Sequence, residues 1–162
     1  MAGPRWLTPQ ERRAWIAFVG VLVKLPYALD TDCKQLSRIS HFEYLVLSAI
    51  SEAPNRSIPM NELATLANSS LSRLSHVVAR MEERGLVRRQ PCPGNGRVTN
   101  ATLTEEGMEV VVDTAPGHVA AVRSLVFDVL SPAQVSQLDD ICHAVLRRID
   151  PEGEWPPRST RR

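Results

Sequence analysis

Most of the chain carries apolar residues at the three- and four-residue spacing of an amphipathic α-helix. The spacing is clearest at residues 70–84, and Gly85 follows as a candidate for a left-handed helix C-cap. Residues 86–89 and 98–103 then have the composition of two β-strands around a tip rich in Pro, Gly and Asn. The pattern therefore predicts a helix followed by a short hairpin. The predicted apolar face of that helix consists of Leu71, Leu74, Val78 and Met81.

Long helices are predicted at both ends of the chain. A capping box at Thr8 opens a helix over 8–35, in which Pro26 is expected to produce a kink or a break. Helical spacing also covers 105–150, where Pro116 leaves open whether the first part is one kinked helix or two segments. Both apolar faces are broader than a small domain needs for its own core. We therefore expect these segments to form a dimer.

Between the long helices, the signals for helix starts predict a helix-turn-helix. A capping box at Ser40 opens one helix, and a short helix with Asn61 as its cap follows. A short turn then leads to the helix that Ser70 caps. In this motif the second helix enters the DNA major groove while the first braces it. The expected fold is therefore mostly α with a small β wing, a winged helix-turn-helix over 40–104 flanked by long dimerisation helices.

Composition is consistent with a soluble protein of one domain over residues 1–162. The chain is 43% hydrophobic and 23% charged, as in ordinary globular proteins. Lys24 and Pro26 interrupt the most apolar run, and no cleavage pattern of a signal peptide is recognisable, so we expect a cytoplasmic protein that does not contact a membrane. The segment 151–162 is expected to be a flexible tail.

Positive charge is concentrated in the middle of the chain. The net charge is only +1, but residues 70–97 contain six arginines and two acids, while the remainder is slightly acidic. Contact with DNA phosphates requires a basic segment of this kind. An ordinary solvated helix face explains the charge equally well.

The residue types on the predicted recognition helix favour DNA binding. Arg73 can donate two parallel hydrogen bonds to a guanine edge. Ser70 and Ser72 can donate to phosphate beside the free amides of the helix start. His76 fits either a DNA contact or a solvated surface, and Arg97 fits either the minor groove or a mobile loop.

Catalytic motifs are not recognisable in the sequence. A Gly-rich phosphate loop, a metalloprotease helix and a nucleophile elbow are all missing from the pattern, and we expect no enzyme activity and no cofactor. The three cysteines stand at wide, unpatterned spacing, which argues against a disulfide framework and against a zinc ribbon.

Several segments, taken together and in order, resemble the multiple-antibiotic-resistance regulators, the MarR family, of the actinobacterial type. The resemblance runs from about residue 8 to 149. It is carried by SHFEYLVL (40–47), MNELA (60–64), LSRLSHVVARMEERGLVRR (71–89), GR (96–97), ATLTEEG (101–107) and APGHVAAVRSLVFDVLSP (115–132).

This resemblance implies a homodimer that binds a palindromic operator in double-stranded DNA and acts as a repressor. It places Ser72, Arg73 and His76 where the family reads bases, Arg80 at phosphate or the groove edge, and Arg97 at the wing tip in the minor groove. The family's repressors are commonly released by a small aromatic or phenolic ligand, or by oxidation. A non-enzymatic winged helix that binds protein is the competing class.

Three alternatives for the release signal remain open. A ligand pocket between the first, second and fifth helices is the first, although its aromatic residues fit a core and dimer interface equally well. Oxidation of Cys33 is the second, if Lys34 and His41 lower the pKa of its thiol. Zinc at Cys33, Glu43 and His118 is the third. The proposed lining of the ligand pocket is Trp15, Phe18, Tyr27, His41 and Tyr44.

Overall fold

The computed structural model describes residues 3–92 and 95–151, with side chains omitted at 95–97. The predicted tail beyond Pro151 and the tip of the wing lie outside the described residues. The helices are α1 (Pro9–Ser37), α2 (His41–Glu52), α3 (Met60–Leu66), α4 (Leu71–Glu83), α5 (Glu105–Val122) and α6 (Pro132–Ile149). The strands are β1 (Ser57–Pro59), β2 (Val87–Cys92) and β3 (Asn95–Leu103), and two short turns of helix are η1 (Pro54–Arg56) and η2 (Arg123–Phe127).

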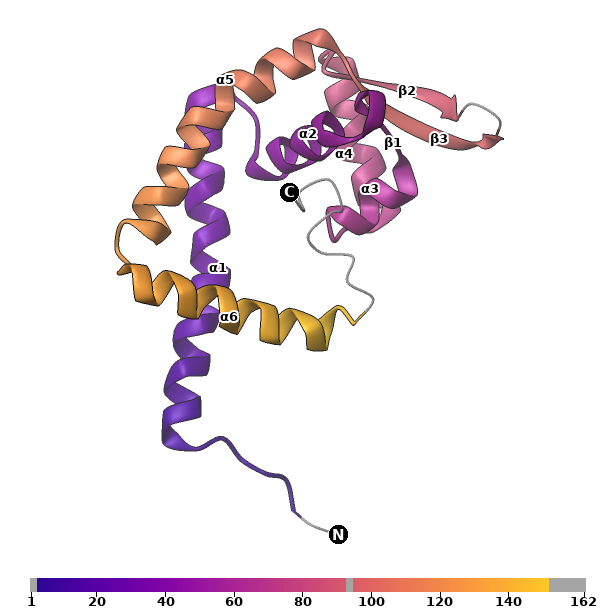
Figure 1. Ribbon diagram of the computed structural model, residues 1–162. Coiled ribbons are helices and arrows are strands. Elements are labelled where there is room, and N and C mark those ends of the chain that lie inside the picture. The colour runs from indigo at the N-terminus through magenta and orange to yellow at the C-terminus, as the bar shows by residue number, and fades with distance from the viewer. Residues whose placement is uncertain (1–2, 93–94, 152–162) are drawn as a thin grey trace.

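The long N-terminal helix α1 forms a single element through Pro26. Thr8 caps it with the predicted capping box, and Arg38 ends it in the left-handed region with φ 56°. Proline removes one intrahelical hydrogen bond, but the bonds on either side continue the helix. The expectation of a break is therefore wrong, and α1 reaches from its exposed N-terminal half to the winged part of the molecule (Figure 1).

The winged part is built around one hydrophobic core formed by α2, α3, α4 and the sheet. Leu47, Leu63, Leu74 and Val78 are fully buried there. Two expectations fail at helix starts. Pro59, and not Asn61, is the N-cap of α3. Leu71, expected on the buried face, is 52% exposed because it lines an open hollow beside Met60 and Ser75 instead of the core.

The wing is a three-stranded antiparallel sheet in the order β1–β3–β2. Its hairpin strands are longer than predicted, and Ile58 of β1 pairs with Ala101 of β3 in a third strand that the sequence did not predict. Three residues are too few for a recognisable alternation, so β1 depends on its pairing with β3. The mostly helical fold with a β wing is confirmed.

The start of α5 lies directly against the end of the recognition helix. Thr104 donates its N–H to the Leu86 carbonyl over 3.1 Å and its hydroxyl to the Gly85 carbonyl over 2.7 Å. Gly107 packs so closely that a Cβ atom would overlap the Leu86 oxygen and approach Leu103 Cδ1 to 2.8 Å. Glycine is therefore required here for a close approach of two backbones.

The C-terminal helices leave the winged part. α5 continues unbroken through Pro116, which settles the alternative left open by the sequence, and the chain turns through η2 into α6 (Figure 1). Among the described residues, α6 has no fully buried side chain. Its apolar face and that of α1 are exposed; the larger exposed residues include Trp15, Ile16, Leu22, Val23, Ile141, Val145 and Ile149.

By length and composition alone, two segments pass a test for membrane-spanning helices. These are Pro9–Ser37 and Glu105–Phe127, whose most apolar windows are 6% and 11% buried. The expectation that Lys24 and Pro26 prevent such a run is therefore too strict. Helices whose apolar faces pack against another subunit pass the same test, so the result is weak support for a membrane.

Candidate nucleic-acid interface

The recognition helix α4 is fixed at both ends and along one face. At its start, the Ser70 hydroxyl accepts the Arg73 N–H at 3.2 Å. At its end, Gly85 adopts φ 76°, and the N–H of Leu86 donates to the Met81 carbonyl over 2.9 Å. These two features form a Schellman cap. Buried side chains such as Leu74 hold the inner face in the core. The outer face is therefore held rigidly towards solvent.

That outer face carries the residues that the sequence selected for DNA contact. Ser70, Ser72, Arg73, His76 and Arg80 are all exposed. They line one open hollow together with Ser40 and Phe42 of the α2 start. Arg97 lies in β3, but its side chain is outside the described residues. Five of the six proposed contact residues thus share one surface.

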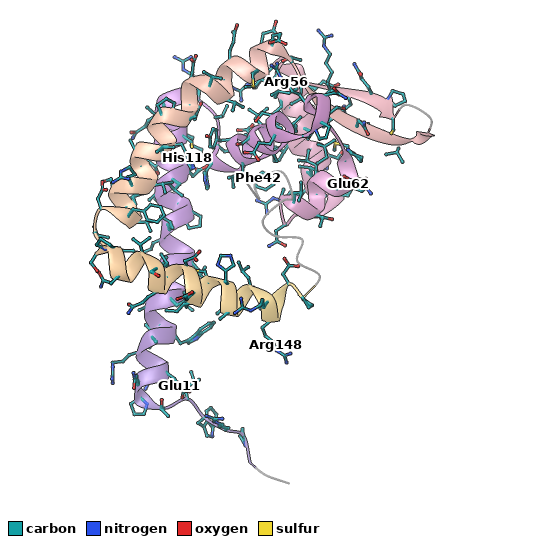
Figure 2. The ribbon with its side chains drawn as sticks, in the orientation of Figure 1. Glu11, Phe42, Arg56, Glu62, His118 and Arg148 are labelled. Atoms are coloured by element: carbon teal, nitrogen blue, oxygen red, sulfur yellow. The ribbon has the colours of Figure 1, made fainter. Side chains whose placement is uncertain are left out.

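The Arg73 guanidinium lies over an aromatic ring from another helix. The guanidinium carbon lies 5.0 Å from the centroid of the Phe42 ring. Phe42, at the start of α2, is labelled in Figure 2. Sequence reasoning missed this role, because nothing in the local pattern around Phe42 indicates a partner on α4.

The wing is joined to α4 by an ion pair. Arg89 donates its backbone N–H and its guanidinium to the Glu82 carboxylate, with distances of 2.7–2.8 Å. These hydrogen bonds, led by that from the backbone, hold the pKa of Glu82 below its usual value. Arg89 therefore joins the wing to the recognition helix, and the exposed Arg88 points to the other face of β2.

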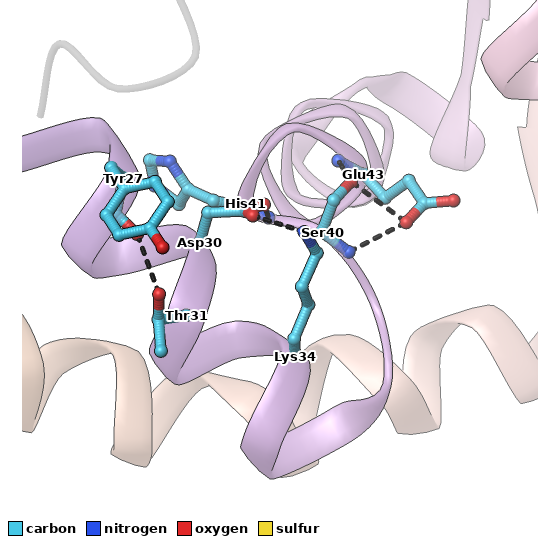
Figure 3. Close-up of polar contacts among 7 residues, drawn as sticks. All are labelled: Tyr27, Asp30, Thr31, Lys34, Ser40, His41 and Glu43. Carbon is cyan, nitrogen blue, oxygen red and sulfur yellow. Dashed lines mark hydrogen bonds and ion pairs between the residues drawn. The ribbon is translucent and has the colours of Figure 1, made fainter. Parts of the chain in front are cut away.

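A second polar cluster joins α1 to α2 (Figure 3). Asp30 accepts the His41 N–H over 2.9 Å and contacts the Lys34 ammonium at 2.6 Å. Lys34 and this N–H, in that order, lower the pKa of Asp30. Ser40 and Glu43 complete the capping box beside it. The Asp30 carboxylate, through its hydrogen bond to His41 and its ion pair with Lys34, thus joins the start of α2 to α1.

Two histidines meet where α1, α2 and α5 converge. The rings of His41 and His118 stack with centroids 5.4 Å apart, and the Tyr44 ring lies 4.7 Å from His118. His41 Nε2 and His118 Nδ1 are buried without a hydrogen-bond partner. Burial lowers the pKa of both imidazoles, so the neutral forms are favoured. Two unsatisfied buried nitrogens can accept or donate hydrogen bonds to a bound molecule.

The five residues proposed to line a ligand pocket are not brought together. His41 and Tyr44 contact His118 in the histidine cluster. The sequence did not suggest His118 as a residue of the ligand pocket. Trp15 and Phe18 lie together on the N-terminal half of α1, with ring centroids 6.3 Å apart. Tyr27 is 77% exposed. One turn of helix advances about 5.4 Å, so Trp15 lies more than three turns from Tyr27 along α1.

The surroundings of Cys33 oppose its use as a thiol sensor. Its side chain is 1% exposed, and burial, with Asp30 and Asp32 nearby, raises the pKa of the thiol. Lys34 contacts Asp30 and not the sulfur. The conditions for a reactive thiolate are therefore not met.

The residues suggested for zinc do not assemble either. Glu43 uses its carboxylate to cap α2 and lies 3.8 Å from Arg84. Across residues 3–92 and 98–151, no three His, Cys, Asp or Glu side chains are placed to share a metal ion.

Comparisons with known proteins agree with this arrangement. A family model described as "MarR family" matches residues 35–98. The solved structure of Sco3205, a MarR family transcriptional regulator from Streptomyces coelicolor in complex with DNA, superimposes with a TM-score of 0.87 at 42% identity. That alignment covers 91% of this chain and 92% of Sco3205. AbsC, another MarR family regulator from Streptomyces coelicolor, gives a TM-score of 0.84 at 36% identity, over 90% of this chain and 98% of AbsC.

A curated relative gives a shorter match. The HTH-type transcriptional repressor IacR of Pseudomonas putida is 31% identical over 105 residues, which cover 65% of this chain and 61% of IacR. The chain spans about 60% of the length of the curated relatives that it matches.

Proposed function

Because the chain belongs to the MarR family of transcriptional regulators, we propose that it is a homodimeric repressor that binds a palindromic DNA operator sequence-specifically. One observation carries the proposal: a rigidly anchored α4 presents Ser72, Arg73, His76 and Arg80 to solvent on one face. A relative with 42% identity and nearly full coverage was solved in complex with DNA. The function is regulatory and not enzymatic.

The proposed contacts follow from side-chain chemistry. Arg73 donates to a guanine edge in the major groove, and Ser72 and His76 contact neighbouring bases. Ser70 and Arg80 contact phosphate, which fixes the register of α4 on the duplex. Arg97 enters the adjacent minor groove from the wing.

Dimerisation is supported by the apolar faces that this chain does not cover itself. Trp15 of α1 is 55% exposed, and Ile141 and Ile149 of α6 are 59% and 71% exposed. Exposed apolar surface of this extent is typical of a protein–protein interface. A two-fold dimer built from α1, α5 and α6 presents two recognition helices to half-sites about 10 bp apart.

Release by a small aromatic or phenolic molecule is the proposed control, in a protein located in the cytoplasm. The histidine cluster of His41, His118 and Tyr44 supports a binding position at the α1–α2–α5 junction, since two of its buried nitrogens have no partner. Of the five residues that the sequence suggested as the lining of a ligand pocket, only His41 and Tyr44 belong to this proposed binding position. The buried state of Cys33 makes oxidation the weaker alternative.

Selection of bound sequences from a random pool of duplexes tests the function. Enrichment of a palindrome is expected, with binding that weakens as salt is raised, because phosphate contacts release counterions. R73A should lose about 5- to 150-fold in affinity for the selected duplex, which corresponds to about 1–3 kcal/mol of base discrimination. Its affinity for random duplex should change much less.

Arg12→Ala provides a matched control. It removes the same charge from an exposed position in the first turn of α1, far from the wing (Figures 1 and 2). Affinity of this variant for the selected duplex should stay close to that of the wild type. A pool without any enriched sequence would contradict specific binding and favour a winged helix that binds protein.

A further inference from the structure

We propose that Phe42 is a positioning residue for Arg73, and that its ring sets how strictly α4 discriminates the base pair that Arg73 contacts. The inference rests on the proposed function and deepens it. It starts from the contact of 5.0 Å between the Arg73 guanidinium carbon and the Phe42 ring centroid.

The contact restrains a side chain that is otherwise free to move. Arg73 is exposed, and among residues 3–92 and 98–151 no carboxylate forms an ion pair with it. An arginine side chain has several rotatable bonds, and fixing them on binding costs entropy. A ring beneath the guanidinium removes part of this cost before DNA arrives.

The contact with Phe42 leaves the hydrogen-bond donors of Arg73 available. A guanidinium is planar, and its five N–H groups point outward in that plane. The Phe42 ring, over which the guanidinium carbon lies, offers no acceptor oxygen, so this contact does not take up the two parallel donors needed for a guanine. A carboxylate partner would instead occupy those donors. An aromatic platform is therefore suited to a base-reading arginine in a way that an ion pair is not.

The platform is itself fixed in place. Phe42 is the second residue of α2, between His41, whose N–H is held by Asp30 at 2.9 Å, and Glu43, which closes the capping box on Ser40. Its half-buried ring packs against the hydrophobic core. Because Asp30 belongs to α1, the position of the ring under Arg73 depends on how α1 and α2 are joined.

Two substitutions separate positioning from simple structural support. F42L removes the ring but keeps an apolar side chain, and F42Y keeps the ring. The assay measures binding to the duplex selected by the wild type and to the same duplex with its Arg73-contacted base pair replaced. F42L should reduce the ratio of the two affinities by about two- to five-fold, the range expected for one exposed cation–π contact. F42Y should restore the ratio.

A double-mutant cycle supplies the internal control. In the R73A background, F42L should leave the affinity ratio unchanged, since no guanidinium remains to be positioned. A structural defect of F42L would instead weaken binding to both duplexes equally and would persist beside R73A. Either of these results would overturn the inference.

A readout without DNA completes the test. In NMR spectra of the free wild-type protein, the Arg73 side-chain protons should be shifted upfield by the ring, and the shift should vanish in F42L and remain in F42Y. Its absence in the wild type would refute the contact. If the wild type selects a sequence but F42L keeps the full affinity ratio, the positioning role alone fails. If no sequence is selected, the proposed function fails and the inference with it.

Discussion

Replacing Gly107 by alanine should destabilise the junction between the wing and the long helix α5. The added Cβ atom would overlap the carbonyl oxygen of Leu86 and lie 2.8 Å from Leu103 Cδ1. The obstacle is a backbone oxygen within a hydrogen bond to Thr104, so no rotation of a side chain relieves it. The first turn of α5 must move instead.

The size of the effect follows from the contacts that this movement disturbs. Overpacking at a fixed backbone costs about 1–3 kcal/mol. The N–H of Gly107 donates to the Thr104 hydroxyl over 2.9 Å, and losing this cap costs about 1 kcal/mol more. The better helix propensity of alanine returns up to about 1 kcal/mol. We therefore expect a net loss of about 1–4 kcal/mol, or roughly 2–16 °C in Tm.

Gly117 provides a matched control on the same helix. An alanine there would meet only the end of the Leu36 side chain, which is 56% exposed and can rotate away. G117A should therefore be neutral or slightly stabilising. Thermal melts at one fixed protomer concentration compare the two variants, because oligomerisation makes Tm depend on concentration. A G107A protein that melts with the wild type would refute the close approach of α5 to Leu86.

Three further predictions test other parts of the molecule. I141E on the apolar face of α6 should weaken the dimer at least about ten-fold in sedimentation experiments, whereas S136E, at an exposed position on the opposite face of the helix, should not. E82Q should remove the ion pair between Glu82 and Arg89, whose side chains are 32% and 37% exposed. The free energy of unfolding should fall by less than about 1 kcal/mol at low salt and should not fall at high salt, because salt screens exposed charges. Burial lowers the pKa of His41 and His118 below the usual 6.5, so the unfolded chain binds more protons than the folded chain as pH falls past that value. The free energy of unfolding should therefore decrease from about pH 6.5 downward until the lowered pKa values are reached, and H118F should reduce this dependence in denaturant titrations. A pH-independent wild type would contradict the buried neutral pair.

Much of the fold was predictable because its signals are local. The capping boxes at Thr8 and Ser40 and the left-handed Gly85 fix helix ends through contacts within a few residues. The exposure of Ser72, Arg73 and His76 follows from the 3.6-residue period once Leu74 and Val78 face the core. These features therefore follow from the order of residues alone.

The sequence predictions were wrong where contacts between residues far apart in the chain decide the structure. β1 forms because Ile58 pairs with Ala101 of β3, and the strand is too short to show an alternation of apolar and polar residues. The position of Cys33 looked favourable for a reactive thiol, yet the packing of α1 buries the sulfur and directs Lys34 to Asp30. Neither result depends on neighbours in the sequence.

The sequence by itself determined that this protein has an amphipathic recognition helix, a basic wing and long apolar helices at both ends. Periodicity and capping are properties of neighbouring residues, so they can be deduced without coordinates. Only the tertiary structure decided that Phe42 lies beneath Arg73, that His41 stacks on His118, and that Arg89 is bound to Glu82. Those contacts join different elements, and their geometry arises from how the helices pack in one core.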